Sequence, residues 1–224
     1  MKNYYSILIP IHNEARSIPS LIKKLKPYKK DGHEIIIIND GSTDESKVLL
    51  ERYSFVKLYS FKQNKGKGVA VKHGLSVASN DHIIIFDGDL ELCPSDIKKL
   101  MILNIKNNIN CVIGNRFENS PTILNIWNIG NIFFSFLFNL IHKTNFEDVL
   151  CCAKAFYKKD IDHNKLKSRN FDIDIEILSI LVEKTNNIRT VSLEYNRRTK
   201  KQGKKLNIFD TWVILDRIIR LTRS

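Results

Sequence analysis

Apolar residues along the first 116 positions follow two alternating patterns. Short all-apolar runs, such as residues 35–38 and 83–86, are typical of strands buried on both faces of a parallel sheet. Between these runs, apolar residues recur at intervals of three and four, as in residues 18–25, which predicts helices with one buried face. The alternation predicts an α/β fold built on a Rossmann-like, mostly parallel sheet with helices on both faces.

Local sequence signals give the boundaries of these elements. The predicted strands lie at residues 7–11, 34–38, 55–61, 81–86 and 111–114. Pro27 is expected to end the first helix. Ser42 and Glu45 have the spacing of a capping box and are expected to begin the second helix, in which Val48 faces inward.

An acidic run leaves the strand predicted at residues 81–86. Asp87, Asp89 and Glu91 stand at alternate positions, separated at first by the small residue Gly88. Carboxylates so close together repel one another, and a hard divalent cation such as Mg2+ or Mn2+ relieves that repulsion. The alternative interpretation is a solvated acidic turn, because short motifs often match by chance.

Polar residues also follow the other predicted strands. Glu14, Asp40 and Arg116 come after strand ends, where α/β sheets bind ligands. The loop at residues 64–68 could hold a phosphate through backbone N–H groups, but it lacks P-loop spacing and equally fits a tight turn. His73 is interpreted as a structural histidine, because no second His or Cys stands at ligand spacing.

Five segments are considered together: residues 9–14, 38–44, 64–68, 86–91 and 112–117. They read Ile-Pro-Ile-His-Asn-Glu, Ile-Asn-Asp-Gly-Ser-Thr-Asp, Asn-Lys-Gly-Lys-Gly, Phe-Asp-Gly-Asp-Leu-Glu and Val-Ile-Gly-Asn-Arg-Phe. In this order they resemble family 2 glycosyltransferases of the GT-A fold, and within them the branch that transfers hexoses to polyprenyl or dolichyl phosphate. Asn39 and His12 depart from that pattern, where the family often has Asp and Tyr.

The resemblance implies roles for individual residues. It makes Asp87, Asp89 and Glu91 the metal ligands, and Asp89, Arg116 and Asp148 the catalytic residues. Contacts with the nucleotide sugar are expected from Pro10, His12, Glu14, Ile38, Asp40, Lys67, Asp87, Gly88, Asp89, Arg116, Arg198 and Lys205.

The acceptor side matches the family less closely. Residues 146–156 resemble the family's acid followed by a strand ending in Lys-x-Phe, which makes Asp148 an acceptor-side candidate. Residues 171–178 resemble an acidic helix start across the acceptor pocket. Asp172 and Asp174 have a second explanation, since acids in a first turn also favour the helix dipole.

Residues 123–142 predict a helix of unusual polarity. Its polar residues form one narrow stripe and the rest is apolar, with no charge from 123 to 141. Interrupted in this way, the segment is not expected to span a membrane. Such a surface needs a cover, either as peripheral contact with a membrane or lipid acceptor, or by the core, a homodimer or a membrane-protein partner.

The carboxyl-terminal segment is basic. Residues 197–205 contain six Lys or Arg and no acid, and an amphipathic helix follows at 207–224. The resemblance implies a loop that closes over phosphates, with Lys205 in its Lys-Leu end. The remaining charges could hold an anionic leaflet, at about 1 kcal/mol each.

Composition narrows the class of protein. The net charge of +12, from 36 basic and 24 acidic residues, points to phosphate-bearing partners. Nucleic acid is disfavoured, because the basic residues are not interleaved with aromatic ones and no recognised module is present. The four cysteines lack CxxC pairing and suggest a reduced, cytoplasmic protein, and a strand pattern from Ser6 leaves no room for a signal peptide.

The leading hypothesis is a single GT-A domain over residues 1–224, with a nucleotide-sugar-binding half at 1–116 and an acceptor half at 117–206. It would be a metal-dependent inverting glycosyltransferase, moving a hexose from GDP-mannose or a UDP-sugar to a polyprenyl phosphate at the cytoplasmic face of a membrane. One alternative is a family member with a saccharide or protein acceptor, using Asp148, Asp172 or Asp174 as base. Another is a non-catalytic module that binds nucleotide sugar or membrane.

Overall fold

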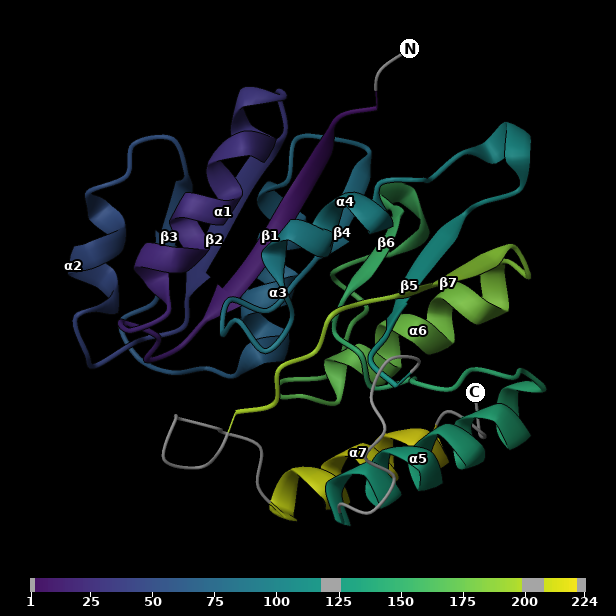
Figure 1. Ribbon diagram of the computed structural model, residues 1–224. Helices are drawn as coiled ribbons and strands as arrows, with labels where there is room; N and C mark the ends of the chain where they lie inside the picture. Colours follow the sequence, from purple (N-terminus) through teal and green to yellow (C-terminus); the bar gives the residue numbers. More distant parts are fainter. Residues whose placement is uncertain (1–2, 118–125, 199–207, 221–224) are drawn as a thin grey trace.

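The computed structural model describes residues 3–117, 126–198 and 208–220, and in them the strands form one mixed sheet (Figure 1). The strand order is β3-β2-β1-β4-β6-β5-β7. β6 is antiparallel to β4 and β5, whereas the other neighbouring strands are parallel. The strands are β1 (Tyr5–Ile11), β2 (Glu34–Asn39), β3 (Lys57–Ser60), β4 (His82–Ile85), β5 (Cys111–Asn115), β6 (Lys154–Tyr157) and β7 (Ile188–Ser192). The predicted mostly parallel sheet is confirmed.

Helices cover both faces of this sheet. One apolar cluster joins it to α1, α2 and α4, and a second joins it to α3, α5, α6 and α7. The helices are α1 (Ile18–Lys30), α2 (Ser46–Glu51), α3 (Lys67–Val77), α4 (Ile97–Leu100), α5 (Ile126–His142), α6 (Ile173–Lys184) and α7 (Ile208–Arg220). Tyr5, Ile7, Ile9 and Ile11 of β1 lie in the first cluster and Leu8 lies in the second, so the strand is buried on both faces of the sheet.

The central parallel strands bring three loops to one edge of the sheet. β1 pairs in parallel with β2 on one side and with β4 on the other. The backbone N–H of Phe86 still bonds the carbonyl of Leu8 (3.0 Å), which extends the pairing to the start of the acidic run. Residues 12–14, 40–45 and 87–91 therefore leave the sheet side by side, as expected for parallel strands.

The first helix does not end at Pro27. α1 continues to Lys30, and the buried Tyr28 donates a hydrogen bond from its hydroxyl to the carbonyl of Pro94 (2.8 Å). This tertiary contact holds the last turn although Pro27 removes one backbone donor.

The predicted capping box is also wrong. The Ser42 hydroxyl donates to the side-chain oxygen of Asn39, and α2 begins only at Ser46, without a side-chain cap at Glu45. In α2, Ser46 and Leu50 are buried, and Val48 is 55% exposed instead of facing inward.

No described helix is both long and apolar enough to cross a membrane.

Candidate active site

A cavity of about 340 Å³ opens at the carboxyl ends of β1, β2 and β4. Its other walls include Asn131 of α5, Asp174 of α6 and Ile214 of α7. The structure brings most of the predicted site residues to its lining: Pro10, His12, Glu14, Asp40, Lys67, Asp87, Gly88, Asp89, Glu91, Arg116 and Arg198.

Asp40 organises the glycine–lysine loop of this cavity. Its carboxylate accepts hydrogen bonds from the backbone N–H groups of Lys65 (2.7 Å) and Gly66 (2.9 Å). Its own carbonyl lies 2.8 Å from Nδ1 of His12. Gly66 has a φ of 98°, which side-chain-bearing residues rarely adopt. Asp40 therefore fixes the backbone conformation of the glycine–lysine loop, in addition to lining the cavity.

The backbone passes tightly through Gly88. A Cβ at this position would lie 2.5 Å from Cγ2 of Ile11, so only glycine lets the chain run this close to β1. The close approach places Asp87 and Asp89 just beyond the carboxyl end of β4. Leu90, at a φ of 65°, then turns the chain.

The first acid of the run is already paired. The ammonium of Lys67 lies 2.9 Å from Asp87 and 2.8 Å from Asp174, and only 9% of the lysine side chain is exposed. Burial raises the pKa of Asp87, but the Lys67 charge and hydrogen bond outweigh it and the net shift is downward. Asp87 is therefore an ionised carboxylate held in place by Lys67.

The second acid is crowded by negative charge. Arg198 lies between carboxylates, 2.9 Å from Glu14, 3.1 Å from Asp89 and 4.0 Å from Glu91. Burial and the charges of Asp87 and Glu91 nevertheless raise the pKa of Asp89 to about 6, against the opposing effect of Arg198. More negative charge gathers here than one guanidinium compensates.

These residues fit a divalent cation that also binds substrate. The guanidinium of Arg198 already occupies a cation's position among the acids, and its buried Nε has no hydrogen-bond partner among the described residues. The described residues contain no group of three or more His, Cys, Asp or Glu side chains arranged to hold a metal ion by themselves. Mg2+ and related ions commonly take only one or two carboxylates when substrate phosphates supply other ligands.

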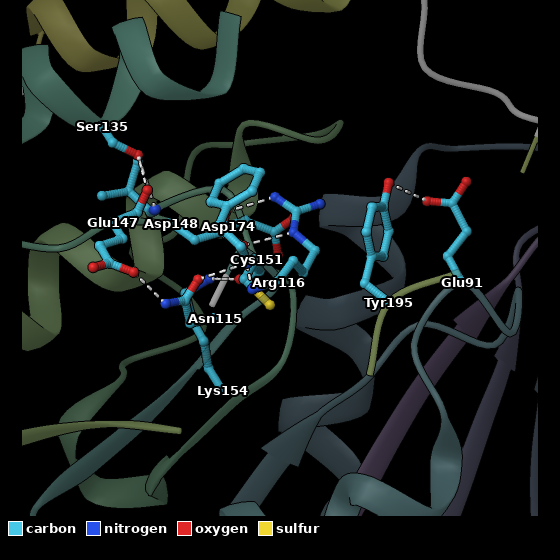
Figure 2. Close-up of polar contacts among 12 residues, drawn as sticks. Glu91, Asn115, Arg116, Ser135, Glu147, Asp148, Cys151, Lys154, Asp174 and Tyr195 are labelled. Carbon is cyan, nitrogen blue, oxygen red and sulfur yellow. Dashed lines mark hydrogen bonds and ion pairs between the residues drawn. The ribbon is translucent and has the colours of Figure 1, made fainter. Parts of the chain in front are cut away.

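Arg116 is held at the cavity wall by a buried carboxylate. Its guanidinium bonds Asp148 through two nitrogens, at 2.7 Å and 2.6 Å (Figure 2). Asp148 is 3% exposed and does not line the cavity, so in this structure it orients Arg116 instead of facing an acceptor. Such a bidentate pair fixes the plane of the guanidinium.

Tyr195 is a cavity residue that sequence reasoning missed. Its hydroxyl donates to Glu91 (3.2 Å), and its ring lies 5.4 Å from the Arg116 guanidinium carbon (Figure 2). An isolated β-bridge pairs Leu92 with Tyr195. The chain just before the basic segment therefore lies beside the chain just after the acidic run. The sequence signal that could have indicated Tyr195 was its position shortly before Arg197 and Arg198.

One predicted nucleotide contact, Ile38, does not line the cavity. Its side chain is fully buried in the core, where Cδ1 packs close to Gly74. Lys205 lies outside the described residues, as do the other lysines of the predicted basic loop.

With this geometry in view, a model of the family described as glycosyl transferase family 2 matches residues 6–166. The chain belongs to that family. The resemblance drawn from the five motifs is confirmed, and the protein is a glycosyltransferase.

Its relatives include two enzymes named for dolichyl phosphate. Dolichyl-phosphate beta-glucosyltransferase of Dictyostelium discoideum is 28% identical over 233 residues, which cover 93% of this chain and 70% of that protein. UDP-N-acetylglucosamine--dolichyl-phosphate N-acetylglucosaminyltransferase of Methanococcus voltae is 25% identical over 242 residues, covering 96% and 94%.

Among solved structures, glucosyl-3-phosphoglycerate synthase from Mycobacterium tuberculosis in complex with Mn2+ and UDP-glucose matches with a TM-score of 0.77. It is 16% identical, and the match covers 99% of this chain and 79% of that one. The predicted GT-A fold is confirmed.

In this family 2 glycosyltransferase, the polar stripe of α5 faces the protein. The Ser135 hydroxyl donates to the carbonyl of Glu147 (3.1 Å), and the Asn139 amide donates to the carbonyl of Phe146 (2.8 Å). His142 lies 3.1 Å from the Ser179 hydroxyl on α6. The helix is thus fastened by its polar side, together with the buried Phe134 and Phe138.

The apolar side of α5 is left exposed, and α7 carries further exposed apolar residues. The two helices lie side by side (Figure 1). We call their exposed apolar residues the outer apolar surface; on α5 these are 49–67% exposed and on α7 38–69%. They are Ile129, Ile132, Phe133, Phe136, Leu140, Trp212, Val213 and Ile219.

Proposed function

We propose that this glycosyltransferase moves a hexose from a nucleoside diphosphate sugar, GDP-mannose or a UDP-sugar, to a polyprenyl phosphate, with inversion and with Mg2+ or Mn2+. The reaction would take place at the cytoplasmic face of a membrane. The observation that carries the proposal is a single cavity walled by paired carboxylates and cations at the strand ends and by α5 and α7, the helices of the outer apolar surface.

The donor side has the size and charge for a nucleotide sugar. At about 340 Å³ the cavity falls within the usual range of small-molecule sites, about 300–1,000 Å³. Lys67, Arg116 and Arg198 line it and could neutralise a diphosphate. Two relatives named for dolichyl phosphate, one also for UDP-N-acetylglucosamine, support this donor and acceptor class.

The chemistry requires charge neutralisation at the leaving group. An acceptor phosphate oxygen forms a bond to the anomeric carbon while the bond to the nucleoside diphosphate breaks. Arg116, oriented by Asp148, and Arg198 would stabilise the negative charge that grows on the departing diphosphate. A divalent cation held by Asp87, Asp89 and Glu91 would supply Lewis-acid neutralisation of the same charge.

The pairing of the acceptor-side acids favours a phosphate acceptor over a saccharide. A sugar hydroxyl needs a general base, but each candidate base already pairs with a cation: Asp148 with Arg116, Asp172 with Arg217 and Asp174 with Lys67. A phosphate monoester has a second pKa of about 6, so it is mostly dianionic at neutral pH and needs no base.

Contact with the membrane would come from the outer apolar surface. Large exposed apolar patches mark protein or membrane contacts, and the net charge of +12 favours an anionic leaflet. The described cysteines are all free, which fits a reducing compartment.

A product assay tests the reaction. Radiolabelled GDP-mannose, UDP-glucose and UDP-N-acetylglucosamine are each incubated with protein, Mn2+ and polyprenyl phosphate. We expect label from one donor to enter a butanol-extractable, mild-acid-labile product. Label that appears only on added saccharides would refute the lipid acceptor, and absence of transfer from all three donors would refute the proposed donor class.

A sedimentation assay tests the membrane contact. Leu140, 67% exposed on α5, is changed to Glu, and Val48, 55% exposed on the distant α2, is changed to Glu as a matched control. We expect Leu140→Glu to lower binding to anionic liposomes at least fivefold and Val48→Glu to leave it unchanged. Equal binding by both variants would contradict the assignment.

A further inference from the structure

We infer that Lys67 and Asp174 are positioning residues that couple the donor cation site to helix α6 on the acceptor side. Lys67 begins α3, Asp87 follows β4, and Asp174 lies in the first turn of α6. The Lys67 ammonium joins these three elements, at 2.9 Å from Asp87 and 2.8 Å from Asp174. The inference rests on the proposed role of Asp87 as a cation ligand.

The backbone around Lys67 is locked to the acceptor half. The N–H of Gly68 donates to the carbonyl of Arg169 (2.8 Å). A Cβ on Gly66 would lie 2.2 Å from that carbonyl oxygen, and one on Gly68 would lie 2.5 Å from the carbonyl oxygen of Ser168. Both glycines are therefore needed for this contact, which packs the start of α3 directly against the segment that precedes α6.

The ammonium and one of its two carboxylates have little access to water, whereas the side chain of Asp87 is 26% exposed. The side chains of Lys67 and Asp174 are 9% and 7% exposed, and the Phe171 ring lies 5.6 Å from the ammonium. Charges in such surroundings are weakly screened, so a change at one acid is felt at the other through the shared lysine.

Sharing makes the charge of Asp174 matter to the donor site. While Asp174 is ionised, Lys67 divides its attraction between two acids, and Asp87 keeps negative charge to offer a cation. Without that charge, Lys67 pairs with Asp87 alone and competes directly with a cation for it. Asp174 therefore keeps Asp87 available for the donor cation.

The same helix provides a matched comparison. Asp172 is as buried as Asp174 and lies only two positions away, but its partner is Arg217 of α7 at 3.0 Å. Asp172→Asn removes the same charge as Asp174→Asn. Asp172, however, has no contact with Lys67 among those described.

The experiment measures Mn2+ affinity without turnover. Mn2+ is titrated by electron paramagnetic resonance into folded protein holding UDP or, in parallel, GDP, with circular dichroism to check the fold. We expect Asp174→Asn to weaken Mn2+ binding about fivefold and Asp172→Asn to change it less than twofold. In a Lys67→Met background, Asp174→Asn should have no further effect, because the shared lysine is gone.

Several outcomes would overturn the coupling. They are an unchanged affinity in Asp174→Asn, equal weakening by Asp172→Asn, or a full Asp174→Asn effect that persists with Lys67→Met. If Lys67→Met does not fold, the contrast between the two aspartate variants decides. Asp87→Asn separates this inference from the proposed function: if it leaves Mn2+ affinity intact, the proposed cation site itself is wrong, whereas loss in Asp87→Asn alone rejects only the coupling.

Discussion

The two aspartates of the acidic run should have opposite effects on stability when each is changed to Asn. Asp89 is crowded by Asp87 and Glu91, and its pKa is raised to about 6, whereas the pKa of Asp87 is lowered by Lys67. Asp89→Asn therefore removes an unfavourable charge. Asp87→Asn leaves the buried Lys67 with one acid fewer.

The size of the Asp89 effect follows from its pKa. The difference between about 6 in the folded protein and 3.8 ordinarily corresponds to at most about 3 kcal/mol in favour of the variant at neutral pH. This figure already includes the attraction of Arg198, and solvent screening of a side chain that is 25% exposed reduces it to about 1–2 kcal/mol. For a domain of this size, the melting temperature should rise by about 2–8 °C.

The sign of the stability change in Asp89→Asn can be tested through its dependence on pH. Because the folded pKa is above the unfolded one, ionised Asp89 costs stability fully above pH 6, and the cost disappears as the pH falls towards 3.8. Thermal melts at pH 7.5 and 4.5, without divalent cations, should show the gain of Asp89→Asn shrinking at the lower pH. Asp87→Asn, the matched control, should melt lower than the natural protein at pH 7.5. The reasoning is refuted if Asp89→Asn melts lower than the natural protein, or if both variants shift the same way.

Two further predictions concern catalysis and acid stability. Arg116→Lys should lower kcat at least tenfold at saturating donor in the product assay, because lysine cannot make the bidentate bond to Asp148; unchanged kcat would remove Arg116 from the mechanism. Glu34→Gln should cost about 1–2 kcal/mol at pH 7 and less as the pH falls, measured by urea unfolding between pH 7 and 3. Burial raises the pKa of Glu34, but hydrogen bonds from Lys57, Ser6 and Ser79 lower it to about 2, so its stabilisation is present above 4.5 and lost towards 2. A cost independent of pH would contradict that origin.

The donor half could be predicted from sequence because its signals are local. The apolar runs of β1, β2 and β4 allow only strands buried on both faces, and parallel pairing then fixes where Glu14, Asp40 and Asp87 emerge. Neighbour relations in the second half are not local. β6 lies antiparallel between β4 and β5, and no local pattern in the sequence predicts this placement.

The sequence likewise does not show which charged residues of the site pair with one another. The sequence places Asp148, Asp174 and Arg198 near the cavity, but it cannot show that each already has an oppositely charged partner. Those pairs join residues far apart in the chain, and only the folded arrangement selects them. The burial of the Ile38 side chain was hidden as well, since its motif position says nothing about which way the side chain points.

The inward polar stripe of α5 separates two tasks along one helix. Ser135, Asn139 and His142 fasten the helix by hydrogen bonds, while Phe136 and Leu140 make little contact with the rest of the chain. Outward positions can therefore vary in size and shape with small effect on folding. Under the membrane contact proposed above, related enzymes could adapt to lipids of different thickness or chain length by changing these positions alone, leaving the chemistry and the scaffold untouched.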